Sequence, residues 1–478
     1  MSRGWPGFSR VSLGRHEPDR NRLRWHSASL DSARPTSRTT KCHRGRLSDE
    51  KTPQQAVELI SLQVAKMSPK NSSDVEVEFK LARANTKIYT PFTSSYSPSS
   101  TLYELQGIKI NPYGSKGNQS SYIITGTTGS AFTAGGVGAV YVGAIDGKRT
   151  STGSGSGEWI NFNVPFNGYT GTSCYGADIL SSGIGPGGIG NVALVGTWTD
   201  SSNNILGFYY DGKLSQLKNN SAAPIQFKSF QAVTSKDGPA RYTYLHSIDA
   251  GFAVGNYSTR AGYVGWFLNS GAESGSYVYN PKNNSQVNAV YKNADYTFHS
   301  LFGIWLNKNN TYTVSGGGSN AKLLPGYDAI LKVLPNQGQG LPQDATFGRG
   351  MIADIDPITG IAKNEKYYNF QNDPSDQVFT HFQGIYYAGK GVYEVPFDAL
   401  TSSGEFSIGI AYIKRLDNGT FSEKALWQVF QAPTSGGLVS NDSVADMGSV
   451  GALSSSSLTT FASISETKSY LVAAQSLC

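Results

Sequence analysis

Cysteine, charged residues and long apolar runs are all scarce in this sequence. Three cysteines, Cys42, Cys174 and Cys478, occur in 478 residues, which excludes a fold built on several disulfides. No stretch approaches the roughly 18 apolar residues of a membrane-spanning helix. We therefore predict a soluble protein without a membrane span. Charged residues make up only 15% of the chain, a share that fits poorly with a helical protein.

Glycine and aromatic residues are abundant instead. The chain has 55 Gly, 27 Tyr and 22 Phe, and 12% of its residues are aromatic. This composition, together with many Ser, Thr and Asn, is typical of short strands joined by turns. The aromatic content argues against disorder of the body. We therefore predict an all-β protein.

Basic residues are concentrated at the N-terminus. Residues 1–70 contain ten Arg and four Lys against six acidic residues, whereas the rest carries 26 basic and 28 acidic residues. The nearly neutral body predicts no nucleic-acid partner. We predict a disordered Arg/Ser-rich leader over 1–70 and a linker over 71–99. An organelle transit peptide and a misplaced start codon, with Met67 as the true beginning, are the alternatives.

The leader contains no recognisable secretory signal, because no apolar stretch of 7–15 residues follows its basic start. The composition of the body slightly favours an extracellular protein, and the localisation stays open. Several Asn-x-Ser/Thr sequons would allow glycosylation: Asn118, Asn219, Asn256, Asn283, Asn309, Asn418 and Asn441.

One pattern recurs along the body. It consists of Val-Gly or Thr-Gly in an extended run, a polar turn, and a Gly–aromatic–aliphatic run that ends in Asp-Gly or Asn-Ser-Gly. "VGTWTDSSNNILGFYYDG" and "VGNYSTRAGYVGWFLNSG" show it most clearly. The six copies span residues 122–147, 195–212, 254–271, 312–334, 391–419 and 442–465. Alternation within each run predicts strands rather than helices.

The distance between copies predicts the architecture. Gly126 and Gly196 are 70 residues apart and Gly196 and Gly255 are 59 apart, enough for four short strands and a loop. Four-stranded sheets that pack radially bury faces that one sheet leaves exposed. We predict a β-propeller over residues 100–478, with six four-stranded blades, or seven if residues 100–114 pair with 468–477. A β-solenoid and a pair of β-sandwiches are the alternatives.

The copies "ALVGTWTDSSNNILGFYYDG" and "FAVGNYSTRAGYVGWFLNSG" also resemble bacterial extracellular β-propeller repeats. Units of that family read Val-Val-Gly, a turn, then Phe-Leu-Tyr before Asp-Gly, and the resemblance covers about residues 120–465. The family's His-Ala-Phe triplet is missing here. The resemblance implies a repeat architecture and carries no defined activity.

Three histidines of the body, His246, His299 and His381, each come shortly before the second strand of a repeat. Cys174 takes what looks like the same place in the second copy. Equivalent positions in a propeller lie on a circle about its axis, so we expect these residues to form a ring. They would tie neighbouring blades together, act as acid or base, or hold a metal with Cys174.

Carboxylates accompany these histidines. Asp249 follows His246, Asp295 precedes His299 on what we expect to be the same strand face, and Asp376 precedes His381. A carboxylate beside an imidazole raises its basicity, although Asp is also an ordinary turn residue. The catalytic candidates are His246, His299, His381 and Asp295.

Aromatic residues recur near the predicted strands. Most should pack between blades, and a subset at the central mouth could stack on a sugar or another flat ligand. The ligand-binding candidates are Trp198, Trp266, Trp305 and Tyr387.

No motif identifies a cofactor or a metal. "GIGPGG" at residues 183–188 matches Gly-x-Gly-x-x-Gly, but a strand-like segment follows it where a dinucleotide site needs a helix. We predict neither group. The favoured function is a binding propeller with a carbohydrate or another small molecule at the central mouth. The alternative is a lyase, isomerase, cyclase or hydrolase with His/Asp acid–base chemistry in the axial pocket.

Overall fold

Short, mostly antiparallel strands make up most of the residues that the structure describes, as the composition predicts. The structure is a computed structural model. It describes residues 82–84, 87–89, 103–116, 119–128, 135–144, 158–180, 191–218, 226–234, 238–259, 273–296, 298–323, 346–373, 378–401, 406–430, 446–447, 459–465 and 469–475.

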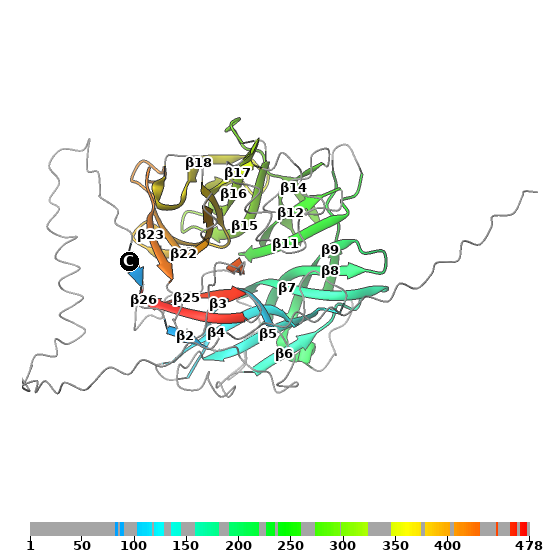
Figure 1. The fold of residues 1–478 in the computed structure, drawn as a ribbon. Helices are drawn as coiled ribbons and strands as arrows, with labels where there is room; N and C mark the ends of the chain where they lie inside the picture. The colour runs from blue at the N-terminus through cyan, green and yellow to red at the C-terminus, as the bar shows by residue number, and fades with distance from the viewer. Residues whose placement is uncertain are drawn as a thin grey trace, which may run out of the picture. The chain divides into compact units, whose positions relative to one another are not determined.

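The first three blades are antiparallel four-stranded units that follow one another along the chain (Figure 1), and one parallel pair, Tyr242 with Ile205, links blade 3 to blade 2 in a single sheet. Blade 1 consists of β3 (Tyr103–Lys116), β4 (Gln119–Thr128), β5 (Val137–Ala144) and β6 (Glu158–Phe162). Blade 2 consists of β7 (Tyr169–Ile179), β8 (Asn191–Asp200), β9 (Ile205–Lys213) and β10 (Phe227–Phe230), with helix α2 (Leu214–Lys218) before β10. Blade 3 consists of β11 (Tyr242–Asp249), β12 (Phe252–Ser258), β13 (Ser274–Asn280) and β14 (Ser285–Asn288).

The last three blades repeat the unit, and blades 5 and 6 each gain one strand from the N-terminal side, β1 and β2. Blade 4 consists of β15 (Phe298–Leu306), β16 (Tyr312–Leu323), β17 (Thr346–Ile355) and β18 (Ala362–Tyr368), followed by the 3₁₀ turn η3 (Phe370–Asn372). Blade 5 consists of β19 (Val378–Phe382), β20 (Tyr386–Gly389), β21 (Val392–Thr401), β22 (Phe406–Lys414) and β23 (Leu426–Phe430), with β1 (Ala82–Ala84) parallel to β23. Blade 6 consists of β24 (Asp446–Met447), β25 (Thr459–Ser465), β26 (Ser469–Gln475) and β2 (Lys87–Tyr89).

The hydrophobic cores lie between consecutive blades. Ile123 and Val140 of blade 1 pack in one cluster with Leu194 and Phe208 of blade 2. Further clusters join blades 2 and 3, blades 3 and 4, and blades 4 and 5. Each sheet therefore buries its faces against its neighbours in the ring, which explains why its strands are apolar on both faces.

The ring is closed between its ends. β24 contacts β21 of blade 5, and β25 and β26 contact β3 of blade 1 (Figure 1). β2, which precedes blade 1 in the chain, pairs with β26 of the last blade. The fold is thus an all-β propeller of six blades, as predicted.

The predicted seven-bladed alternative is wrong for the part of the chain that the structure describes. It required residues 100–114 to pair with 468–477, but β3 pairs with β4, and β26 pairs with β25 and β2. The closing strand β2 lies in the stretch that we assign to a linker from the sequence. The domain boundaries themselves, including the leader over 1–70, stay a prediction.

The repeated hairpin pattern locates the middle strands of the blades, but in two blades the partner strand is not the one that the pattern predicts. In blade 3, β12 pairs with residues 274–280, and the expected return strand within 260–272 lies outside the described residues. In blade 4, β16 pairs with residues 346–355 instead of the segment before 334. The sixth copy supplies β24 and β25, the first two strands of its blade.

Side-chain hydrogen bonds stabilise the tight turn between β8 and β9. Between β8 and β9, Asp200 Oδ1 accepts hydrogen bonds from the amides of Ser202 and Asn204, both at 2.8 Å. Asn203 has a φ of 61°, a left-handed conformation that Asn tolerates well. The stretch Asp-Ser-Ser-Asn-Asn is therefore sufficient to reverse the chain between the two buried strands.

Candidate functional site

The innermost strand of each of the first five blades carries a β-bulge at the same place. The pairing of β7 with β8, for example, shifts register between Cys174 and Gly176, which leaves Tyr175 as an extra residue. The extra residues of β3, β7, β11 and β15 are Gln106, Tyr175, His246 and Phe302. In blade 5 one extra residue lies among 383–385, between β19 and β20, and we assign Gln383 to this place because Gly384 follows it as Gly107 follows Gln106. Bulges of this kind re-aim the side chains that follow them.

A small residue follows each bulge because neighbouring inner strands nearly touch there. A Cβ on Gly107 would lie 2.4 Å from the Tyr175 carbonyl oxygen, and one on Gly303 would lie 2.8 Å from the Gly384 carbonyl carbon. Blade 3 has Ser247 at this place. Like positions of adjacent inner strands therefore meet at the bulge.

Three residues beyond each bulge, the inner strands present a set of polar and aromatic side chains. We call this the axial set: Lys109, Asp178, Asp249, Trp305 and Tyr386. Asp178, Asp249 and Trp305 lie at or near the end of an inner strand, Tyr386 begins β20, and Lys109 lies within the longer β3. The set is the candidate functional site.

The charged members of the axial set form one cluster across three blades. Lys109 Nζ lies 3.1 Å from Asp178 Oδ1 and 2.6 Å from Asp249 Oδ1, and it donates to the Ile248 carbonyl at 3.1 Å. Asp249 Oδ2 also accepts the Leu306 amide of blade 4 at 2.5 Å. A side chain of blade 1 reaches blade 3 only near the axis, where the inner strands converge.

Partial burial makes this cluster stronger than a surface ion pair. The side chains of Lys109, Asp178 and Asp249 are 24%, 13% and 15% exposed. Burial alone would lower the pKa of Lys109, but attraction and hydrogen bonds from both carboxylates raise it above its usual range. The ammonium is therefore charged throughout the physiological range and holds both carboxylates in place.

The aromatic members of the axial set lie in the next two blades. Trp305 and Tyr386 meet edge-to-face, with ring centroids 5.2 Å apart at an interplanar angle of 79°. Both residues are partly buried. Carboxylates accept hydrogen bonds from hydroxyl groups, and aromatic faces pack on the C–H groups of a sugar ring. The axial set therefore combines the side-chain types that recognise a polyhydroxylated ligand.

Two of the three predicted histidines come together at Phe302. The His246 ring lies 4.1 Å from Phe302, and the His381 ring meets Phe302 edge-on at 4.5 Å. His246 is itself a bulge residue, whereas His381 precedes the bulge residue Gln383 by two positions. Burial, with a smaller effect of His381, lowers the pKa of His246 to about 3, so this imidazole is neutral at pH 7.

His299 lies elsewhere. It stacks on Tyr291 with ring centroids 3.7 Å apart, and its Nε2 forms a hydrogen bond with the Tyr367 hydroxyl at 2.7 Å. Burial lowers its pKa to about 3. The expectation that the three histidines occupy one equivalent position is thus wrong, because they stand zero, three and two residues before the bulge. Their proposed catalytic roles stay a prediction.

His381 is part of a buried row of Ser300, His381 and Asp398. Its Nε2 lies 3.2 Å from Ser300 Oγ and its Nδ1 lies 3.7 Å from Asp398 Oδ1. The order is that of a hydrolytic triad, but the three residues are 5%, 1% and 0% exposed. Burial raises the pKa of Asp398 well above its usual range, despite a hydrogen bond from Gln383. This row joins blades 4 and 5 and is closed to a substrate.

The remaining sequence candidates are dispersed. Trp198 is buried in blade 2, where its Nε1 donates to Ser229 Oγ at 3.1 Å. The Tyr387 hydroxyl accepts the Gly391 amide at 3.0 Å. Asp295 lies in an exposed turn ahead of β15 and not on a strand with His299. Trp266 and Asp376 lie outside the described residues. Trp305 belongs to the axial set, as does Asp249, the carboxylate that follows His246.

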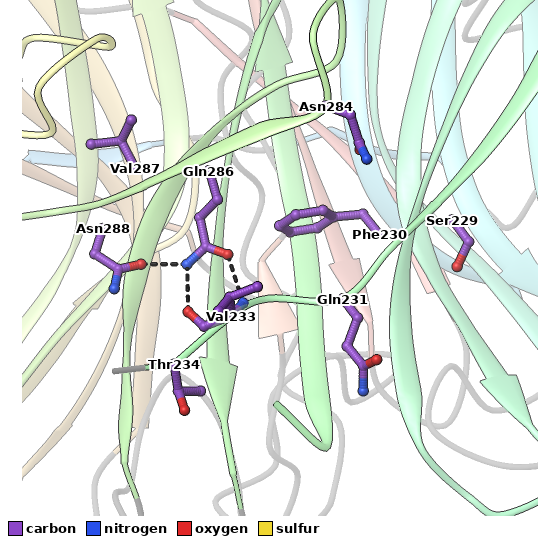
Figure 2. Close-up of a pocket in the computed structure, with 9 residues that line it drawn as sticks. All are labelled: Ser229, Phe230, Gln231, Val233, Thr234, Asn284, Gln286, Val287 and Asn288. Atoms are coloured by element: carbon purple, nitrogen blue, oxygen red, sulfur yellow. Dashed lines mark hydrogen bonds between the residues drawn. The ribbon is translucent and has the colours of Figure 1, made fainter. Parts of the chain in front are cut away.

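An uncharged groove lies at the rim, between β10 of blade 2 and β14 of blade 3 (Figure 2). Its volume is about 630 Å³. The Gln286 side chain bridges the two blades by accepting the Val233 amide at 2.8 Å and donating to the Val233 carbonyl at 3.1 Å. The apolar side chains of Phe230, Val233 and Val287 line the groove together with amides and hydroxyls. None of its lining side chains is charged, and none of the predicted site residues lines it.

In the described residues, no group of three His, Cys, Asp or Glu side chains is arranged to hold a metal ion. The same part of the chain has no helix of the length and hydropathy needed to cross a membrane.

Comparisons with known proteins give structural similarity only. No family model and no curated protein matches the chain. A levansucrase variant from B. megaterium has a TM-score of 0.35 at 11% identity, over 78% of this chain and 96% of its own. A GH43_1 enzyme from Xanthomonas citri has a TM-score of 0.32 at 9% identity, over 82% and 91%. An exo-1,5-alpha-L-arabinanase from a bovine ruminal metagenomic library has a TM-score of 0.31 at 9% identity, over 65% and 94%.

Sequence reasoning missed Lys109, Asp178 and Tyr386, although a signal for them exists. The inner strands share a five-residue motif: an apolar residue or Cys, the bulge residue, Gly or Ser, Ile or Ala, and the axial residue. Its copies are "LQGIK", "CYGAD", "LHSID", "LFGIW" and "FQGIY". Alignment on this motif places the axial set in one column.

Proposed function

We propose that the protein binds a carbohydrate at the axial set. The observation that carries the proposal is the Lys109–Asp178–Asp249 cluster beside the Trp305–Tyr386 pair, all at one place on consecutive inner strands. An ammonium that fixes two carboxylates pre-orients hydrogen-bond acceptors for sugar hydroxyls, which lowers the entropic cost of binding.

The neighbouring aromatic rings support the same proposal. Trp305 and Tyr386 are amphipathic, and their edge-to-face contact holds both rings in fixed orientations. A sugar presents hydroxyls on its edge and C–H groups on its faces. It can therefore bond to the carboxylates while one face packs on a ring.

A printed array of mono- and oligosaccharides tests the proposal across many sugars at once. We expect the native protein to retain specific glycans and Trp305→Ala to lose them. Trp305→Phe, which keeps a ring beside Tyr386, should retain part of the binding and controls for misfolding. A folded Trp305→Ala protein with the native array profile would contradict the proposal.

A glycoside hydrolase is a second candidate, and the pairing of Asp178 and Asp249 favours it. Glycoside hydrolysis uses two carboxyl groups on either side of the scissile bond, one as acid and the other as base or nucleophile. Mass spectrometry of array-positive oligosaccharides after incubation distinguishes the candidates. Shortened products that disappear in Asp178→Asn would establish hydrolysis, and unchanged oligosaccharides would leave binding alone.

A further inference from the structure

Three exposed turns share an Asn-x-Ser/Thr sequence and one local geometry. At Asn309, the side-chain Oδ1 accepts the Thr311 hydroxyl at 2.7 Å and the Thr311 amide at 3.3 Å. At Asn418, the same atom accepts the Thr420 hydroxyl at 2.7 Å and the Thr420 amide at 3.0 Å. At Asn283, it accepts the Ser285 hydroxyl at 2.6 Å.

The backbone of these turns brings the asparagine side chains to the surface. The middle residues Asn284, Asn310 and Gly419 all have positive φ values, of 54°, 59° and 86°. All three sequon asparagines are exposed. Oδ1 takes these hydrogen bonds, so none of them occupies the nitrogen Nδ2, the atom to which a glycan would be joined.

A fourth sequon provides an internal contrast. Asn256, followed by Tyr257 and Ser258, is 1% exposed within β12. Its Nδ2 donates to the Leu301 carbonyl at 3.0 Å, and its Oδ1 accepts the Leu301 amide at 2.8 Å. Asn256 therefore ties blade 3 to blade 4. The sequence motif alone does not separate it from the other three, but the structure does.

The three exposed sequons also lie at one end of the blades. They follow β13, β15 and β22, so each lies between the first and second or the third and fourth strand of its blade. In an antiparallel blade these two connections lie at the same end of the strands. Inner strands meet at like positions both at the bulge, where Gly107 meets Tyr175, and three residues beyond it, where Lys109 meets Asp178, so they run in the same direction. Trp305 of the axial set lies four residues before Asn309, so this end of the blades is also that of the axial set.

We propose that Asn283, Asn309 and Asn418 are N-glycosylation sites. The donor would be a lipid-diphosphate-linked oligosaccharide, used by an oligosaccharyltransferase. The Nδ2 atom forms a bond to the anomeric carbon, the bond from that carbon to the diphosphate oxygen breaks, the lipid diphosphate leaves, and one Nδ2 proton passes to the transferase. The glycans would lie around the end of the blades that carries the axial set. The glycan on Asn283 would be next to Asn284, which lines the rim groove (Figure 2).

The test is site-by-site occupancy in the full chain. The chain is secreted from yeast behind a cleavable signal peptide, and the folded protein is treated with peptide-N-glycosidase F in ¹⁸O-water, which marks each occupied Asn as labelled Asp. We expect labelled Asp at 283, 309 and 418, and unmodified Asn at 256.

Variants separate the sites and control for folding. Asn309→Gln and Thr311→Ala should each remove one glycan from the mass of the secreted protein, and Thr311→Ser should keep it. Ser258→Ala, which destroys the Asn256 sequon but keeps Asn256 itself, should leave the mass of the glycans unchanged. Absence of label at all three turns, or a labelled Asn256 in folded protein, would overturn the proposal.

Discussion

Lys109 Nζ in blade 1 lies 2.6 Å from Asp249 Oδ1 in blade 3, so one ion pair joins two blades that are not neighbours in the ring. Asp178 of the blade between them completes the contact. The cluster thus has two consequences: it fixes the first three blades around the axis, and it presents two carboxylates in a defined arrangement.

Removal of Lys109 should therefore destabilise the fold in a pH-dependent way. We expect Lys109→Met to cost about 1–3 kcal/mol, the range for hydrogen bonds to charged groups. The pKa of Lys109 is raised in the folded state, so its contribution is complete below the unfolded pKa of about 10.4 and is lost as the pH rises above it. Urea unfolding of both proteins should show a constant gap from pH 7 to 9 that narrows above pH 10.4. A gap that widens there would contradict this.

His246 should make the protein sensitive to acid. Its pKa of about 3 lies below the usual value of 6.5, so the unfolded chain binds a proton first and stability falls between pH 6.5 and 3. His246→Gln places at this bulge the residue that blades 1 and 5 already have there. We expect the variant to lose less stability than the native protein between pH 7 and 4, with unchanged array binding. Lost binding in a stable variant would instead show that His246 contributes to the ligand site.

The repeated glycine after the bulge should be intolerant of a methyl group. Gly303→Ala would place a Cβ 2.8 Å from the Gly384 carbonyl carbon in blade 5. We expect a loss of about 1–3 kcal/mol by overpacking. Ser247→Ala at the same place in blade 3 is the matched control and should change stability by less. Equal melting temperatures for the Gly303→Ala and native proteins would show that the inner strands are not in close contact.

Ring closure should depend on β2 and not on the leader. A chain that begins at residue 77 keeps β1 and β2, whereas one that begins at residue 91 lacks both. We expect the first to have the same melting temperature as the full-length protein. The second should melt several degrees lower and aggregate, because the edge of β26 is then exposed. Identical melting curves for the two would rule out closure by β2.

The sequence was sufficient to predict the blades because the middle strands are long, apolar and separated by recognisable turns. The closing strand β2 could not be predicted, since three residues, Lys87–Tyr89, carry no periodic pattern. The axial set was missed for a different reason. Its members differ in charge and size, so a search for repeated residue types finds the histidines and passes over Lys109 and Asp178. The shared motif is short, and the bulge that aligns it becomes visible only in the strand register.

Isothermal titration with the strongest array ligand tests most directly whether the axial set is the binding site. Asp249→Asn removes the carboxylate charge and keeps one oxygen, which can accept from either Lys109 or the Leu306 amide but not from both, because the two donors bond to different oxygens of Asp249. Asp295→Asn makes the same change in an exposed turn away from the site. We predict at least a tenfold weaker Kd for Asp249→Asn, equivalent to about 1.4 kcal/mol, and a native Kd for Asp295→Asn. A native Kd for a folded Asp249→Asn protein would contradict carbohydrate binding at the axial set.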